Sequence, residues 1–275
     1  MRLADVGELG LLAELERRGL VERIENDAAE LSGGRVVTQD VLVEGVHFRL
    51  DWISWRDLGF RAAAVNLSDL AASGAEPEGL VVSLAARSET AVADVVELYE
   101  GLAETGVPVI GGDTSASDRL VVSVTALGRS PRVPGRGGAR PGDSVVVTGA
   151  LGAGGAAFRE ERYARPPLRI AEGRDLARRA HALTDISDGL ARDAGNIAAR
   201  SACRLVIDLE RVPLAPGATV DDLAFGEDYE LLAALPDGSA AFTTIGRCVS
   251  GEGIELRLRG KPVELPAFEH FRREP

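Results

Sequence analysis

Apolar and polar residues along the first half of the chain follow patterns that predict strands and helices in alternation. Four runs rich in β-branched and apolar residues are predicted as strands: 35–48, 80–85, 107–110 and 120–127. Three segments with helical spacing or Ala-rich composition are predicted as helices: 9–20, 54–73 and 91–104. Ser54 and Gly74 stand at the ends of the long Ala-rich helix, as a cap and a stop. This alternation is typical of an α/β fold.

A change of pattern near the middle of the chain predicts two domains. Residues 131–143 are rich in Pro, Gly and Arg and show no hydrophobic period. We therefore expect a linker there, between an N-terminal domain at 1–130 and a C-terminal domain at 144–275. Beyond the linker the predicted elements are strands at 144–147, 205–209 and 230–234, a helix after the Gly-rich turn that follows the first of these strands, and a helix at 187–200. The predicted fold class is α/β (α+β), with two mixed α/β domains.

Composition and charge narrow the range of partners. Only 4% of the residues are aromatic while 45% are hydrophobic, so the core is built mainly from aliphatic side chains. Subtracting 43 acidic residues from 31 basic ones gives a net charge of −12, which would repel a nucleic-acid backbone. An acidic residue, Asp5, precedes any apolar run at the N-terminus, which is unlike a signal peptide, and no run of eighteen apolar residues that could span a membrane occurs. We expect a cytoplasmic protein with neither a nucleic-acid nor a membrane partner.

The scarcity of lysine and cysteine excludes several reaction classes. Lys261 is the only lysine, which excludes a P-loop lysine and Schiff-base chemistry elsewhere in the chain. Cys203 and Cys248 show neither disulfide nor zinc-site spacing and are expected to be buried apolar residues. The histidines also lack zinc-binding spacing, and the sequence contains no Gly-x-Ser-x-Gly elbow. Zinc and hydrolase chemistry are therefore not indicated.

Six aspartates share one setting, beside small or hydroxylated residues at the end of an apolar run or the start of a helix: Asp27, Asp40, Asp69, Asp113, Asp185 and Asp188. Such carboxylates suit Mg²⁺, which fills its other positions with water and phosphate oxygens. Any one of them could instead be an ordinary Asp in a turn. Glu227 and Asp228 also follow a glycine and precede a predicted strand, and an exposed turn would explain them as well. Together the acids predict a magnesium and phosphate site.

The Thr-Asp-Ile-Ser-Asp-Gly motif around Ser187 is the sharpest of these patterns. If Ser187 caps the following helix, the first-turn amides can face a phosphate while Asp185 and Asp188 hold the metal. Ordinary helix capping explains the same residues equally well. Glycines before Asp113, including Gly112, let the backbone approach a ligand, so a phosphate chain is predicted to cross that strand end. A plain strand-to-loop turn is the alternative there.

Seven motifs, in this order and at this spacing, resemble the thiamine-monophosphate kinase family. They cover nearly the whole chain, at 7–9, 38–48, 64–72, 110–114, 184–190, 226–231 and 268–271. The family belongs to an ATP-binding superfamily that also contains aminoimidazole ribonucleotide synthetase, selenophosphate synthetase and a hydrogenase maturation protein. Selenophosphate synthetase needs a reactive N-terminal Cys, and the hydrogenase maturation protein needs a C-terminal Cys. The sequence shows neither, so these two members are disfavoured.

The resemblance implies a fold and a reaction. Two α/β domains are expected, with the N-terminal sheets of two subunits joined into a barrel across a homodimer and the ATP site in a cleft near that interface. The expected reaction transfers the γ-phosphoryl group of ATP directly to the phosphate of thiamine monophosphate, giving thiamine diphosphate. Several Mg²⁺ ions would neutralise the repulsion between the two phosphate-bearing substrates. No covalent nucleophile or essential base is expected, because the acceptor phosphate is mostly ionised near neutral pH.

The resemblance also assigns site residues position by position. The family's metal ligands fall on Asp27, Thr38, Gln39, Asp40, Asp69, Asp113, Asp185 and Asp188. Its ATP contacts fall on Gly112, Asp113, Arg136 and Ser187. Its substrate contacts fall on His47, Glu227 and Phe268. A carboxylate and an aromatic face suit the cationic thiazolium of thiamine, and an arginine suits a phosphate.

The sequence departs from the family pattern in three places. Asn26 stands where the family has the first Asp of Gly-Asp-Asp, and Gln39 stands where a hydroxyl residue is usual. The segment between Asp188 and Glu227 is short. Two alternatives stay open: another ATP-dependent reaction of the same superfamily, or a nucleotide-binding dimer whose catalysis is impaired by the change at Asn26.

Overall fold

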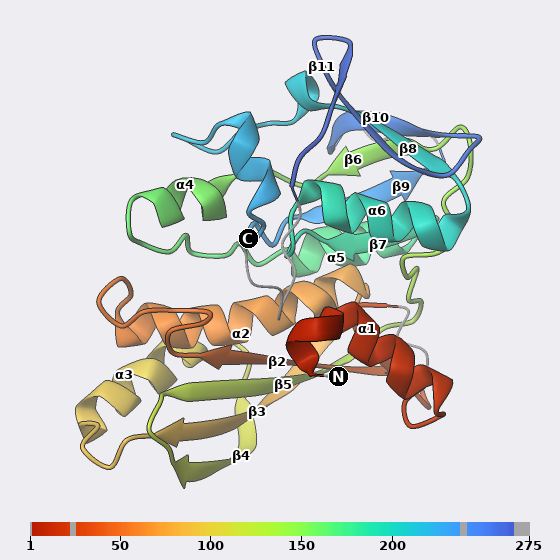
Figure 1. Ribbon diagram of the computed structural model, residues 1–275. Coiled ribbons are helices and arrows are strands. Elements are labelled where there is room, and N and C mark those ends of the chain that lie inside the picture. Colours follow the sequence, from red (N-terminus) through yellow and green to blue (C-terminus); the bar gives the residue numbers. More distant parts are fainter. Residues whose placement is uncertain (1, 23–25, 237–240, 267–275) are drawn as a thin grey trace.

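The protein is described by a computed structural model that covers residues 2–22, 26–236 and 241–266 and contains two β-sheets with helices packed beside and between them (Figure 1). Within these residues the first sheet has, in pairing order, β1 (Ala29–Leu31), β2 (Arg35–Val43), β5 (Val121–Arg129), β3 (Glu76–Ala86) and β4 (Val109–Ala116). The second has β12 (Lys261–Val263), β11 (Gly253–Leu258), β8 (Arg204–Asp208), β10 (Thr243–Val249), β6 (Ser144–Val147), β9 (Leu231–Leu235) and β7 (Ala182–Asp185). Parallel pairs occur only at β3–β4 and β8–β11 among these strands. The mixed α/β fold class is confirmed.

The helices lie mainly in the layers beside and between the two sheets. They are α1 (Leu3–Arg17), α2 (Trp55–Ala72), α3 (Val92–Ala103), α4 (Ala153–Arg159), α5 (Ile170–Ala177) and α6 (Leu190–Ser201), with short 3₁₀ turns η1 (Leu209–Arg211) and η2 (Val220–Ala224). As predicted, Ser54 caps α2, since its Oγ accepts a hydrogen bond from the Asp57 amide at 3.0 Å. Figure 1 shows α2 lying between the two sheets. None of the helices in the described part of the chain is both long and apolar enough to cross a bilayer.

Glycines allow α2 to pack very closely against α3. A Cβ on Gly59 would lie 1.8 Å from the Leu98 carbonyl oxygen, and a Cβ on Gly101 would lie 1.9 Å from the Arg56 carbonyl oxygen. The two backbones therefore touch at a distance that no larger residue permits. This contact fixes α2 over β2 and β5, with its first residues held by α3.

The C-terminal end of α2 packs into the second half of the molecule. Ala71 and Ala72 share one apolar core with residues of β6, α5, β7 and β9. A Cβ on Gly173 of α5 would lie 2.1 Å from the Ala71 carbonyl oxygen, so α5 also approaches α2 closely. One helix thus belongs to both halves, and its side chains can reach a site between them.

The structure overturns two expectations about the motifs. The strand at Val109 does not end before the glycines, because β4 continues through Gly111, Gly112 and Asp113 and pairs in parallel with β3. A Cβ on Gly112 would meet the Val82 carbonyl oxygen at 1.9 Å, so the glycine serves strand contact. Ser187 does not cap α6. The helix begins three residues later, at Leu190, with Gly189 in the N-cap position at φ 105°.

The predicted and observed secondary structures also differ in the lengths of some elements and in segments that show no clear hydrophobic period. Helix α1 begins at Leu3 and is kinked at Gly7, and β2 ends at Val43 rather than at 48. Several elements were not predicted: β1, α5, β7, β10, β11 and β12. Most are short or lie in the second half, where few sequence signals bound them.

Candidate active site

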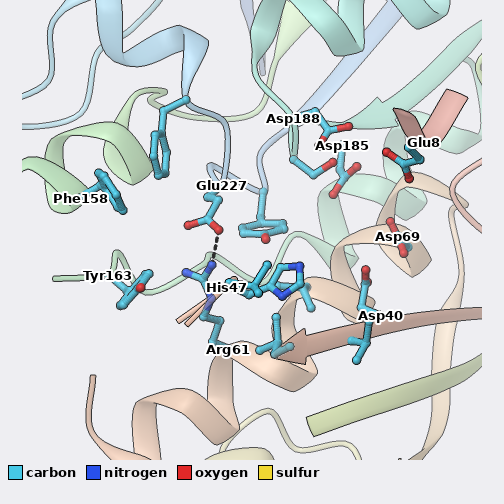
Figure 2. Close-up of a pocket in the computed structure, with 17 residues that line it drawn as sticks. Glu8, Asp40, His47, Arg61, Asp69, Phe158, Tyr163, Asp185, Asp188 and Glu227 are labelled. Atoms are coloured by element: carbon cyan, nitrogen blue, oxygen red, sulfur yellow. Dashed lines mark hydrogen bonds and ion pairs between the residues drawn. The ribbon is translucent and has the colours of Figure 1, made fainter. Parts of the chain in front are cut away.

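A cleft of about 440 Å³ opens between the two halves, beside α2 and β2 (Figure 2). One end, here called the acidic end, is lined by carboxylates: Glu8, Asp40, Asp69, Asp185 and Asp188. The other, here called the aromatic end, is lined by Phe158, Tyr163, Phe225 and Tyr229 together with Arg61 and Glu227. Figure 2 shows this separation, with His47 between the two groups. The cleft therefore offers two chemically different surfaces to a ligand.

Three aspartates distant in sequence meet at the floor of the acidic end. Carboxylate oxygens of Asp27, Asp69 and Asp185 lie within 4.8 Å of one another, a set here called the acidic cluster. They come from the loop before β1, from α2 and from the end of β7. Such a group can hold a cation through oxygen ligands, as Mg²⁺ prefers.

Hydroxyl groups orient each carboxylate of the acidic cluster. Thr38 Oγ1 donates to Asp69 Oδ2 at 2.5 Å, and Ser68 Oγ donates to Asp185 Oδ2 at 2.6 Å. Thr184 Oγ1 donates to Asp27 Oδ1 at 3.1 Å. Thr38 thus lies beside the acidic cluster, as the family resemblance implies for that position.

The acids of this end disfavour one another's charge. Burial, with the charges of Asp188 and Asp27, raises the pKa of Asp40 to about 6. Burial, with the charge of Asp27, raises the pKa of Asp185 to about 8. Burial and three neighbouring carboxylates hold the pKa of Asp69 well above its ordinary value. A bound divalent cation would offset both the burial of these carboxylates and their mutual repulsion, so the arrangement is suited to binding such a cation.

Arg136 brings a positive charge to the acidic cluster. Its guanidinium forms an ion pair with Asp27, and its Nε donates to Thr184 Oγ1 at 3.2 Å. Asn26, the residue that departs from the family pattern, accepts a hydrogen bond from the Arg136 amide at 3.2 Å through Oδ1. Asn26 therefore holds the backbone of Arg136, a contact that an aspartate oxygen can make equally well.

The loop at 185–189 is held from two sides. Asp193 Oδ2 accepts a hydrogen bond from the Asp188 amide at 3.1 Å, and the Asp188 carboxylate lies 3.1 Å from Arg192 Nε. The Ser187 carbonyl accepts a hydrogen bond from the Glu227 amide at 2.8 Å. Ser187 and Asp188 line the cleft together with Asp185.

The structure does not bring all of the expected residues together within one chain. The side chain of Gln39 hydrogen-bonds Ser123 and Thr125 of β5, on the sheet face opposite Thr38. Gly112 and Asp113 lie on the exposed edge strand β4, which β5 and β3 separate from β2. Phe268 lies outside the described residues.

The remaining expected residues are Glu227, at the aromatic end, and His47, between the two ends of the cleft. Glu227 forms an ion pair with Arg61, and the His47 ring nitrogen Nδ1 accepts a hydrogen bond from the Val43 amide at 3.1 Å. The turn around Glu227 is not an exposed surface turn. Asp228 is buried, and its carboxylate accepts the amides of Gly152 and Gly154 at the start of α4.

Several residues of this cleft were not predicted from the sequence, among them Arg61, Tyr163 and Glu8. A signal for Arg61 was present, because Arg61, Val65 and Asp69 follow a spacing of four residues that places them on one face of α2. All three line the cleft. Tyr163 lies in a segment without a period, and no pattern marks it.

Comparisons with known proteins agree on one family. The model for the AIR synthase related protein N-terminal domain matches residues 25–130, and that for the C-terminal domain matches residues 140–255. Thiamine-monophosphate kinase of Aquifex aeolicus is 34% identical over 98% of this chain and 100% of its own length. The enzyme of the same name from Methanopyrus kandleri is 38% identical over 84% of each chain.

A solved structure of AaThiL complexed with AMPPCP and TMP superposes with a TM-score of 0.89, at 33% identity, covering 98% of this chain and 99% of the other. The two domain models together span most of the residues that line the cleft, from Asp40 to Tyr229. The chain belongs to the thiamine-monophosphate kinase family, within the AIR synthase related proteins.

Proposed function

We propose that this protein is a kinase that transfers the γ-phosphoryl group of ATP to the phosphate of thiamine monophosphate, giving thiamine diphosphate. The observation that carries the proposal is the two-part cleft, in which the acidic end and the aromatic end face one space. Metal-bound phosphates suit the first, and a cationic heterocycle suits the second. The relative solved with AMPPCP and TMP, a non-hydrolysable ATP analogue and the acceptor, supports this pair of substrates.

Mg²⁺ ions are proposed to bind at the acidic end, held by Asp27, Asp69 and Asp185 and by the neighbouring Asp40 and Asp188. The donor set fits, because every group is a carboxylate and several have raised pKa values that a cation would relieve. When bound, the ions would neutralise phosphate charge and so reduce the repulsion between the two substrates. Thr38 lies against these ligands and orients Asp69.

The chain's own residues position the reacting groups. Arg136 is proposed to bind a phosphate oxygen of ATP, since its partly exposed guanidinium lies beside Asp27 and Thr184 at the acidic end. Ser187 is proposed to contact the same phosphates from the opposite loop. Glu227 and His47 are proposed to face the thiamine moiety. The acceptor is mostly ionised near neutral pH, so alignment in the cleft is the main task.

We further propose a homodimer in which the first sheets of two subunits close a barrel. All eight residues of edge strand β4 are exposed, including Ile110, which is 59% exposed. A bare, partly apolar edge strand normally pairs or is covered. In such a dimer Gly112 and Asp113 would lie near the ATP site, although they do not reach the acidic cluster of their own chain.

A product assay tests the proposed function directly. Purified protein is incubated with ATP, Mg²⁺ and thiamine monophosphate, and the products are separated to detect thiamine diphosphate and ADP, with thiamine as a parallel acceptor. We expect equal amounts of both products from thiamine monophosphate and their loss when a chelator is added. Nucleotide binding without thiamine diphosphate would contradict the proposal and favour a related ATP-dependent reaction or an impaired enzyme.

A further inference from the structure

Arg61 is unusual for a residue in the middle of a buried helix. It is 2% exposed, and it is among the largest fully buried side chains of the molecule. Its Nε is buried and has no hydrogen-bond partner among the described residues. An unsatisfied buried donor destabilises the folded state, and an apolar side chain on this face of α2 would avoid that cost. Stability alone therefore does not account for an arginine at this position.

The contacts of Arg61 all point to the aromatic end of the cleft. One terminal nitrogen forms an ion pair with Glu227, which lies 166 positions later in the sequence. The guanidinium carbon lies 4.9 Å from the centre of the Tyr163 ring. An aromatic face on one side and a carboxylate on the other hold the guanidinium in one orientation.

The turn that carries Glu227 is fixed from its other side as well. Glu227 and Tyr229 both have left-handed backbone conformations, with φ of 57° and 53°. The Glu227 amide donates to the Ser187 carbonyl at 2.8 Å, and the Tyr229 amide donates to the Ile186 carbonyl at 2.9 Å. Arg61 thus completes the immobilisation of a carboxylate that is still 24% exposed to the cleft.

We infer that Arg61 is a positioning residue that makes Glu227 an oriented hydrogen-bond acceptor for a planar amino heterocycle. The inference rests on the proposed function and concerns the acceptor end of the same cleft. The Arg61–Glu227 pair is neutral overall, so it selects by the direction of a donated hydrogen bond rather than by net charge. Without Arg61, Glu227 is a free carboxylate that rotates and attracts any cation, including Mg²⁺.

The test compares two acceptors that differ at the group that Glu227 would accept. Thiamine monophosphate carries a pyrimidine amino group, and oxythiamine monophosphate carries an oxygen in its place. For each acceptor and for ATP, kcat and KM are measured with the full chain and with Arg61→Met, Arg61→Lys, Glu227→Gln and the double variant Arg61→Met/Glu227→Gln. Arg165→Met is the matched control, because Arg165 also stacks on a ring, Phe60, but pairs with Asp57 and Glu104 outside the cleft.

Arg61→Met is expected to raise the KM for thiamine monophosphate by about tenfold or more, with the KM for ATP changed less than about twofold. The ratio of kcat/KM for thiamine monophosphate to kcat/KM for the oxo analogue should fall by about fivefold or more in Arg61→Met. Arg61→Lys should keep part of this preference. In the Glu227→Gln background, Arg61→Met should add less than about a twofold effect. The control variant Arg165→Met should show the same preference as the unsubstituted protein.

An unchanged preference in Arg61→Met, or equal losses for ATP and for the acceptor, overturns the inference. Effects that add in the double variant also overturn it. If Arg61→Met does not fold, as judged by circular dichroism, the same two acceptors are compared with Arg61→Lys and Glu227→Gln. An unchanged preference in both of these variants rejects the inference.

If the unsubstituted protein forms no thiamine diphosphate, the proposed function is wrong, whatever the outcome for Arg61. The inference is then decided by calorimetric binding of the two acceptors, and equal affinities in the full chain and in Arg61→Met reject it.

Discussion

Hydroxyl side chains explain how so many carboxylates can share one small volume. Each member of the acidic cluster accepts a hydrogen bond from a Thr or Ser of another element: Thr38, Ser68 and Thr184. These bonds set the direction of each carboxylate and lower its pKa, but burial and the neighbouring carboxylates outweigh them, so the pKa values of Asp69 and Asp185 remain raised. The site is therefore arranged for a cation at the expense of the stability of the metal-free protein.

Replacing one of these acids should separate activity from stability. Asp185→Asn removes a carboxylate whose pKa is raised to about 8 and so removes repulsion with Asp27. We expect kinase activity to fall by about a hundredfold or more, while the metal-free protein gains about 1–3 kcal/mol of unfolding free energy. Activity assays and denaturant unfolding with a chelator measure the two effects.

The matched control for this substitution is Asp51→Asn, at an exposed carboxylate paired with Arg49 outside the cleft. It should leave activity unchanged. A loss of stability in Asp185→Asn, with activity retained, would argue that the acidic cluster is a structural network and holds no metal.

Asn26 gives a second test at the residue scale. Asn26→Asp preserves the contact with the Arg136 amide and adds a negative charge beside Asp27. We expect the Mg²⁺ concentration for half-maximal activity to fall by about two- to tenfold, because an added carboxylate strengthens binding of a hard cation. Titration of activity with Mg²⁺ measures the shift. If activity appears only in the variant, the natural chain is the impaired nucleotide binder considered above.

The clustering of candidate site residues could be predicted where a motif fixed both their type and their surroundings. Asp27, Asp69 and Asp185 were named from sequence, and the structure places them in one cluster. Gln39 shows the limit of such reasoning, because strand alternation turns its side chain to the opposite sheet face. Arg61 was not named because a basic residue in an Ala-rich helix carries no chemical signature until its partner 166 positions away is known.

At the scale of elements, α2 determines the geometry of the site. It carries Arg61 to the aromatic end and Asp69 to the acidic end, while its glycine contact with α3 and its alanine contact with α5 hold it from both ends. Asn66 adds a third restraint, since its Oδ1 accepts the Asp40 amide at 3.0 Å and so links α2 to β2. Small displacements of this helix would move both parts of the cleft.

A pair of glycine substitutions tests the close helix contact. Gly59→Ala places a Cβ 1.8 Å from the Leu98 carbonyl oxygen, so α2 and α3 must separate. We expect a loss of about 3 kcal/mol or more of unfolding free energy. Gly195→Ala in α6 is the matched control, because nothing lies within 4 Å of the added Cβ. It should instead stabilise the protein by up to about 1 kcal/mol. Equal melting temperatures for the two variants would contradict a close backbone contact between α2 and α3.

Helices and strands could be predicted where capping residues and hydrophobic spacing marked their ends and no tertiary contact overrode these local preferences. The long helix with its Ser54 cap matches α2 within a residue or two at each end. The strand before Gly112 was ended too early, because Gly-Gly favours a turn locally while pairing with β3 extends the strand. Ser187 was placed as a cap from its residue type, whereas the left-handed φ of Gly189 sets the true start of α6.

At the scale of the whole molecule, the acidic end couples stability to pH and to metal. The pKa values of Asp40 and Asp185 are about 6 and about 8 in the folded chain and near 3.8 when unfolded. Between these values the folded state binds more protons than the unfolded state, so stability falls as pH rises. In chelator, the melting temperature should therefore be lower at about pH 8.5 than at about pH 6.

Added Mg²⁺ should reduce this dependence, because the ion replaces the bound protons and stabilises the folded state most at high pH. Melting curves across pH with Mg²⁺ and with chelator give the comparison. A metal-free protein that becomes more stable between about pH 6 and pH 8.5 would show that these carboxyl groups are not held with raised pKa values.

The shared helix α2 also bears on how this molecule can be divided. Ala71 and Ala72 complete the apolar core beneath β9, and Gly173 meets the backbone of the same helix. A gene fragment cut at the Pro- and Gly-rich segment would leave each product with a bare apolar face, prone to aggregation. Such fragments should be poorly expressed alone and should recover when co-expressed. Exchange of one half between relatives should succeed only when the residues that contact α2 are exchanged with it, so the packing of α2 makes the folding of each half depend on the other.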